Sequence, residues 1–276
     1  MAGCAYCGSR SNPLTREHLF PRGIDSLLLE GGKRGQFFLT RSPDYFVEGA
    51  PTVRDVCRVC NNGALSKLDA YALGLLRQCN RYLSEGETIV LHYDYDLLLR
   101  WLLKMCFNSG ESSRQPRRHV TSRARLYLGK SIIPKRCAVF LRLIHSYVPT
   151  NLERAARAEK GEQAEMLHHE GFRCSLILFP TSVKGEKVGR AITFKSLMFN
   201  VLMLTPKTSH AQFGQFCQDF LCTSPFAVRI LAQRNSVEAS AKGFNTLQAL
   251  HGHFALQGHA HGEPWRKFEE RRSARP

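Results

Sequence analysis

Two Cys-x-x-Cys pairs lie near the N-terminus of this 276-residue chain, Cys4 with Cys7 and Cys57 with Cys60. Each pair can place two thiolates on one tight turn, and two such pairs can complete the tetrahedral four-sulfur site of structural zinc. The alternative is four reduced cysteines without a metal. That alternative would leave a turn-rich segment with little core and no stabilising element. The spacing therefore favours structural Zn²⁺ bound by Cys4, Cys7, Cys57 and Cys60.

A second chemistry-bearing pair, Glu17 and His18, lies in the segment between the two cysteine pairs. A carboxylate next to an imidazole suits hydrolysis of a phosphodiester. The carboxylate can hold a hard divalent ion such as Mg²⁺ or Mn²⁺, and the imidazole can take a proton from the attacking water. Alone the dipeptide carries little weight, because a single histidine is more often structural or simply exposed. Its position between the cysteine pairs is what makes it a candidate site.

The order C-x-x-C, E-H-x-x-P, C-x-x-C-N over residues 4 to about 68 resembles the HNH (ββα-metal) endonuclease superfamily, especially its zinc-knuckle branch. The resemblance implies metal-dependent hydrolysis of DNA, with His18 as general base. It implies that Glu17 and Asn61 hold one Mg²⁺ or Mn²⁺ while the four cysteines hold structural zinc. It also implies a β-hairpin that carries His18 and a helix that begins near Asn61.

Two positions depart from the family pattern. Thr52 stands five residues before the third cysteine, where the family usually has an asparagine that orients the base. Ala64 stands where a lysine is often found, and the loop from His18 to Asn61 is long. The alternative function is therefore a catalytically degenerate zinc-knuckle protein that binds nucleic acid or serves as a scaffold.

The chain carries a formal net charge of +16, which favours a polyanionic partner, with nucleic acid ahead of an acidic membrane surface. Residues 1–62 have a net charge of +2, whereas residues 100–160 contain fourteen Lys/Arg and three Asp/Glu, a net of +11. We expect a basic loop there to contact DNA phosphates. Its candidate residues are Arg114, Arg117, Arg118, Arg123 and Arg125. Phosphate contacts alone leave RNA open as the substrate.

Arg100, Lys104 and Asn108 recur every four residues along a predicted helix. They could follow a phosphate backbone, and a solvated helix face is an equally good interpretation. A histidine-rich stretch near the C-terminus could capture a transition metal, although spare surface histidines are commoner. It contains His251, His253, His259 and His261.

The elements that must position these residues predict an α+β protein. Helical periodicity covers residues 64–83, a strand covers 89–93, and Asp94 or Asp96 caps a second helix that includes Met105. A polar loop is expected at 109–120 and a short helix at 121–129, and a further helix at 209–221. Apolar segments predict a mostly antiparallel sheet farther along. These segments are 137–148, 173–181, 190–204 and 225–232.

The expected organisation is a zinc-stapled HNH module with its closing helix at 1–83, an α+β nucleic-acid- or partner-binding domain at 84–262, and a basic tail at 263–276. Neither an apolar run long enough to span a membrane nor a signal-peptide pattern is present, so a cytoplasmic protein is expected. The remaining six cysteines are expected to be ordinary buried thiols. A phage, mobile-element or bacterial defence nuclease, with a possible protein or guide partner, would have this organisation.

Overall fold

The computed structural model describes residues 3–28, 36–38, 46–48, 52–112, 136–161, 163, 166, 172–177, 179–184, 187–205, 207–246 and 248–249. Several expected features lie outside these residues. They are the basic loop with Arg114, Arg117, Arg118, Arg123 and Arg125, the helix at 121–129, the C-terminal histidines and the tail at 263–276.

The N-terminal segment contains two antiparallel strands followed directly by a helical run. Strand β1 (Leu14–His18) pairs with β4 (Thr52–Cys57). The helical run comprises α2 (Arg58–Cys60), a π-helical turn η2 (Asn61–Leu65) and α3 (Ser66–Arg77). The expected order of strand, strand and helix is therefore present, although the helix begins and ends about six residues before the predicted range. A short helix α1 (Ile24–Leu28) and a strand pair, β2 (Gln36–Phe38) with β3 (Phe46–Glu48), lie within the connection.

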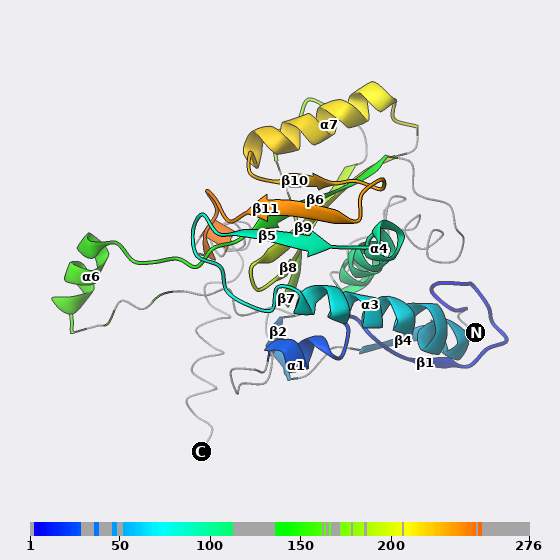
Figure 1. Ribbon diagram of the computed structural model, residues 1–276. Coiled ribbons are helices and arrows are strands. Elements are labelled where there is room, and N and C mark those ends of the chain that lie inside the picture. Colours follow the sequence, from blue (N-terminus) through cyan, green and yellow to red (C-terminus); the bar gives the residue numbers. More distant parts are fainter. Residues whose placement is uncertain are drawn as a thin grey trace, which may run out of the picture.

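A five-stranded antiparallel sheet, in the order β10-β6-β9-β8-β7, is the largest sheet among the described residues (Figure 1). Its strands are β6 (Cys137–Leu143), β7 (Phe172–Leu176), β8 (Lys187–Phe194), β9 (Leu197–Leu204) and β10 (Val228–Ile230). The prediction of one strand segment over 190–204 was wrong. The chain reverses at Lys195 and Ser196, and Lys195 has a positive φ of 45°.

The two faces of this sheet are covered by different helices because residues alternate along each strand. On β6, Ala138 and Phe140 face the side covered by α7 (His210–Thr223), where Phe140 packs against Phe220. Val139 and Leu141 face the opposite side and join the core that includes α4 (Tyr95–Ser112). Helix α4 therefore continues through part of the segment expected to be a loop. Asp94 accepts a hydrogen bond from the Leu97 amide at 3.0 Å, as expected for a helix cap.

Helix α4 lies between the sheet and the N-terminal segment, as Figure 1 shows. The Trp101 ring is fully buried, with its centroid 6.3 Å from that of Phe199 and 6.5 Å from that of Phe172. One contiguous core runs from Cys4 and Leu19 through α3 and α4 to β9. The boundary expected at residue 83 stays a prediction, and the core is continuous across it.

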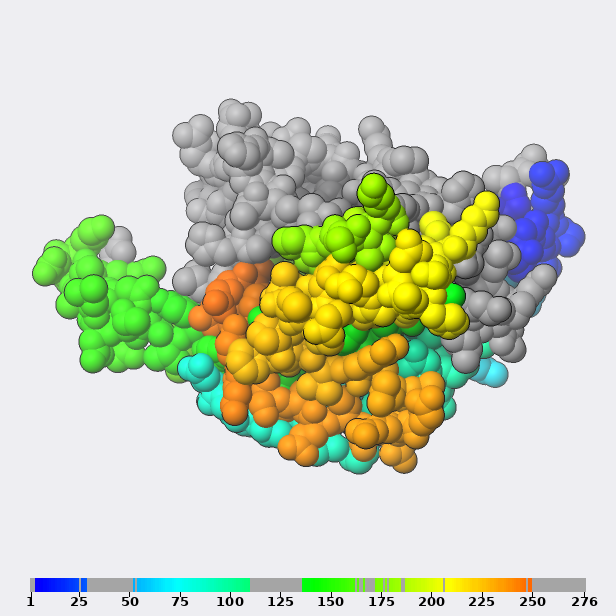
Figure 2. Space-filling model, turned by 90° about the horizontal axis from the view of Figure 1, so that it is seen from above, coloured from blue at the N-terminus to red at the C-terminus, as the bar shows by residue number. Residues whose placement is uncertain are grey.

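A further strand pair and one more helix complete the description. Strand β5 (Thr88–His92) pairs antiparallel with β11 (Ser236–Ser240), a strand that the sequence pattern did not indicate. Helix α6 (Asn151–Ala158) begins with a capping box between Thr150 and Glu153, and all its residues are exposed. It protrudes from the body of the protein in both views (Figures 1 and 2). Within the described residues, no helix has the length and apolar character needed to cross a membrane.

We expect Trp101→Ala to lower the free energy of unfolding by about 3–5 kcal/mol, because it leaves a cavity between α4 and the sheet. Urea unfolding followed by circular dichroism measures the loss. The matched control is Leu152→Ala on α6, where the side chain is 81% exposed and the change should stay below about 0.5 kcal/mol. Equal effects of the two substitutions would show that α4 is not central to the core.

Candidate metal centre and the strand that carries His18

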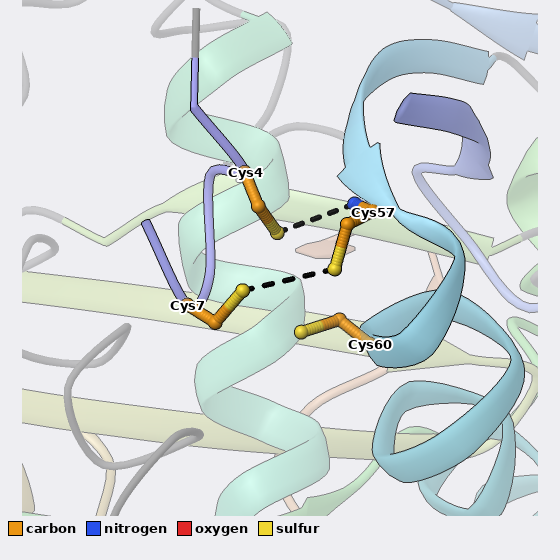
Figure 3. Close-up of side chains that lie close together, drawn as sticks. All are labelled: Cys4, Cys7, Cys57 and Cys60. Carbon is orange, nitrogen blue, oxygen red and sulfur yellow. Dashed lines mark hydrogen bonds between the residues drawn. The ribbon is translucent and has the colours of Figure 1, made fainter. Parts of the chain in front are cut away.

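The four cysteines of the two predicted pairs converge on one point (Figure 3). Their sulfur atoms all lie within 4.8 Å of one another, and the Sγ atoms of Cys7 and Cys57 are 3.7 Å apart. Four sulfurs at about 2.3 Å from a tetrahedral zinc are separated by about 3.8 Å. The cluster is therefore compatible with a zinc site without rearrangement of the backbone.

Backbone hydrogen bonds bring the two pairs together. The Gly8 amide donates to the Cys4 carbonyl at 2.9 Å, which closes the first turn, and Gly8 adopts a φ of +76° that favours glycine. The Ala5 amide donates to the Asp55 carbonyl on β4 at 2.7 Å. The Cys57 amide donates to Cys4 Sγ at 3.2 Å, an interaction typical of a thiolate acceptor.

The thiols show why a cation suits this position. Burial raises the pKa of Cys4, but hydrogen bonds from the Cys57, Cys7 and Tyr6 backbone outweigh it and lower the pKa to about 7. The pKa of Cys60 is raised by burial, by side-chain hydrogen bonds to Cys7 and Cys57, and by the charge on Cys4. The Cys4 thiolate is thus favoured, whereas burial and the nearby negative charge both oppose a thiolate at Cys60. A bound divalent ion removes that opposition.

His18 lies at the end of β1, directly opposite Thr52 on β4. The register of the two strands shifts between Thr15 and Glu17. Such a bulge redirects side chains at functional sites. Its position brings Glu17 into the interior, where the residue is only 3% exposed, and leaves His18 partly exposed.

Asn61 contacts β1 through its side-chain amide. Its Nδ2 atom donates to the Thr15 hydroxyl and to the Arg16 carbonyl, both at 2.9 Å. Thr15 in turn donates to the Val56 carbonyl on β4 at 3.0 Å. The π-helical turn η2 begins at Asn61, and wide turns of this kind often occur at functional sites. The amide nitrogen is committed to β1, so the amide oxygen is the Asn61 atom that could bind an ion.

Glu17 forms a buried ion pair that the sequence did not indicate. Glu17 Oε1 lies 2.7 Å from Nζ of Lys104, which is itself 0% exposed. The same ammonium donates to both carboxylate oxygens of Asp69 on α3 at 2.7 Å. Burial raises the pKa of Glu17 and of Asp69, and the charge of Lys104 opposes that shift in both. The charge of His18 also lowers the pKa of Asp69, so the imidazole lies within electrostatic range of this trio.

A second buried contact joins α4 to Leu19, the residue that directly follows β1. Asn108 Nδ2 donates to the Leu19 carbonyl at 2.9 Å, and the Tyr6 hydroxyl donates to Asn108 Oδ1 at 2.7 Å. The Tyr6 ring packs edge-on against Phe107, with 5.2 Å between their centroids. Neither Lys104 nor Asn108 lies on a solvated helix face or can follow a phosphate backbone, because both are buried against the N-terminal segment.

Sequence reasoning missed Asp69 and singled out Lys104 and Asn108 only for a phosphate contact or a solvated helix face. A signal was present in their types, because lysine and asparagine recur one turn apart within an otherwise apolar stretch. A buried lysine must have acidic partners. Those partners, Glu17 and Asp69, are 87 and 35 residues away along the chain. Periodicity within one helix cannot identify partners at such separations.

The donors at a candidate divalent-ion site are few. Apart from the four cysteines, the described residues contain no group of three His, Cys, Asp or Glu side chains close enough to share an ion. Magnesium usually keeps several waters and takes one or two protein carboxylates together with substrate phosphate oxygens. Glu17 and Asn61 together offer two ligands of this kind, one carboxylate and one amide oxygen. One oxygen of the Glu17 carboxylate already pairs with Lys104.

Comparisons of the chain with protein-family models, curated proteins and solved structures found no match. Function must therefore be inferred from the geometry of the site.

We expect purified protein to contain one zinc ion per chain and Cys57→Ser to contain none. The substitution should also lower Tm by about 10 °C or more, because binding of a structural metal contributes directly to folding. Elemental analysis and thermal unfolding measure the two effects. Cys222→Ser is the control, since its exposed thiol lies outside the cluster and should leave both unchanged. A zinc-free native protein with the stability of Cys57→Ser would disprove the metal centre.

We expect Asn61→Asp to destabilise the protein by about 1–3 kcal/mol with zinc retained, because a carboxylate cannot donate to Thr15 or to the Arg16 carbonyl. Chemical unfolding and zinc analysis test this. The neighbouring Asn62 is exposed, so Asn62→Asp should change stability by less than about 0.5 kcal/mol. If the two substitutions had the same effect, the hydrogen bonds of Asn61 would contribute nothing to the strand.

Proposed function

We propose that this protein is a metal-dependent endonuclease of the HNH type that hydrolyses DNA phosphodiester bonds. The observation that carries the proposal is the placement of His18. It lies partly exposed at the end of one strand of an antiparallel pair, and a helix follows the second strand. A four-cysteine cluster joins the start of the segment to the start of that helix. This order is the one implied by the sequence motif, and the net charge of +16 suits a nucleic-acid substrate.

In the proposed reaction His18 accepts a proton from the water that attacks the scissile phosphorus. Glu17 and Asn61 would hold a Mg²⁺ or Mn²⁺ ion, which supplies charge stabilisation at the phosphate and at the leaving oxygen when bound. Asn61 also keeps β1 against the helical run through its bonds to Thr15 and Arg16. Asp69 contributes negative charge in the neighbourhood of His18, which favours the protonated imidazole formed during the reaction.

The four cysteines have a structural role in this proposal. Their zinc would be coordinated by four protein ligands and would have no open position for water or substrate. The zinc would hold the N-terminal turn against the start of the helical run. The proposed hydrolysis takes place at His18, at the end of β1.

A binding-only protein is the second candidate function, and one observation favours it. The Glu17 carboxylate is buried and paired with Lys104, which reduces its freedom to hold a divalent ion. Thr52 also stands opposite His18 in place of the asparagine expected there. A zinc-knuckle protein with these features would bind nucleic acid or a partner protein without cleaving it.

The test is cleavage of supercoiled plasmid by purified protein in Mg²⁺ or Mn²⁺. We expect His18→Ala to reduce the rate by about 100-fold or more, since a general base contributes that much. His92→Ala is the matched control, because His92 is an exposed histidine on β5 and should keep full activity. DNA binding without cleavage by the unmodified protein would favour the binding-only function. Cleavage that survives His18→Ala would remove His18 from the mechanism.

A further inference from the structure

We propose that Lys104 is a positioning residue for His18, and that it acts from helix α4 by holding Glu17, the strand residue directly before the base, while Asn108 one turn later holds Leu19, which directly follows the base. This inference rests on the proposed nuclease function for its catalytic meaning. Its structural part stands on the contacts of Lys104 and Asn108 alone.

The first contact fixes the residue that precedes His18. Lys104 Nζ lies 2.7 Å from Glu17 Oε1 and the same distance from both oxygens of Asp69. The lysine side chain has no exposed surface, so water cannot take the place of either carboxylate. Because Glu17 belongs to β1 and Asp69 to α3, one ammonium joins the strand of the base to the closing helix.

The second contact fixes the residue that follows His18. Asn108 lies one turn after Lys104 on α4 and donates to the Leu19 carbonyl at 2.9 Å. Its amide oxygen accepts from Tyr6, which belongs to the first cysteine turn. His18 therefore lies between two residues that both contact α4, Glu17 through an ion pair of its side chain and Leu19 through a hydrogen bond to its backbone carbonyl.

This arrangement differs from that of an ordinary buried ion pair. A pair that served stability alone could be replaced by apolar residues of the same volume at little cost. Here Lys104 and Asn108 contact Glu17 and Leu19, the two neighbours of a single partly exposed histidine. The opposite face of α4 packs on the sheet through Trp101, so the position of the base depends on the sheet as well. A lateral error of about 1 Å in the placement of a catalytic group can cost about 100-fold in rate.

The experiment compares the full-length unmodified protein with two variants, Lys104→Met and Lys104→Met combined with Asp69→Asn. The second variant leaves one fewer uncompensated carboxylate and serves for the exchange measurement if the first does not fold, because Asp69 has its own role in the proposed reaction. Arg100→Met is the matched control, since Arg100 lies one turn earlier on α4 and pairs at 2.6 Å with Asp96, whose side chain is half exposed. Zinc content and circular dichroism select the folded, metal-loaded protein before any comparison.

Two readouts are taken on that folded protein. One is the plasmid cleavage rate with protein in excess and Mg²⁺ present, at saturation and as a function of protein concentration. The other is amide hydrogen exchange of the peptide that covers residues 14–20. We expect the Lys104 variant to lose about 100-fold in the saturating rate. Its half-saturating concentration should change less than about 2-fold, and exchange in the peptide should rise about 10-fold or more. Arg100→Met should change none of these.

Each other outcome is decisive. An unchanged saturating rate in folded, zinc-loaded Lys104 variants would reduce Lys104 to a structural role and overturn the inference. Unchanged exchange at residues 14–20 would overturn it as well. If the unmodified protein does not cleave DNA, the proposed function fails by itself. The exchange measurement then still decides whether Lys104 holds the strand of His18.

Discussion

A lysine ammonium without access to water must have its charge compensated inside the protein, and this requirement connects the parts of the structure. Lys104 meets it with a carboxylate from β1 and another from α3. Removal from water of one cation and two anions is costly, and the cost is offset only if the three groups stay in contact. If either the strand or the helix moved away from α4, the buried ammonium would lose one of its two carboxylate partners. The ammonium therefore holds β1 and α3 of the N-terminal segment against α4, and α4 packs on the sheet through Trp101.

The four-cysteine cluster restrains a different part of the same segment. It joins residues more than fifty positions apart, between which lie the strand of His18 and the long connection to β4. The closure of a loop of this length carries an entropic cost, and a bound metal would be the interaction that offsets it. The cysteines thus determine which ends of the segment meet. The contacts of α4 determine where the strand between those ends is placed.

Local patterns in the sequence were sufficient for the cysteine site, for α4 with its Asp94 cap, and for the antiparallel character of the sheet. They failed where the deciding partner is distant. The spacing of Lys104 and Asn108 resembled a solvated helix face, because nothing in the helix indicates Glu17 or Leu19 as neighbours. The reversal at Lys195 was missed because the flanking residues are mostly apolar and no glycine marks the turn. Strand β11 was missed because its partner β5 lies about 150 residues earlier.

Helix α4 is covered on one side by the N-terminal segment and on the other by the sheet, and these two parts leave the ribosome at different times. Helix α4 ends at Ser112, whereas the strands that cover its sheet-facing side extend to Leu204. The partner of β5, strand β11, ends at Ser240. N-terminal parts of a protein generally fold as they emerge. In a nascent chain shorter than about 200 residues, the sheet-facing side of α4 therefore stays exposed to solvent. The helix that contacts the His18 strand then does not yet pack on a complete sheet. The residues of the candidate hydrolytic centre are thus synthesised first, but the packing that positions them forms last. Unfinished chains contain these residues without the packing that positions the His18 strand.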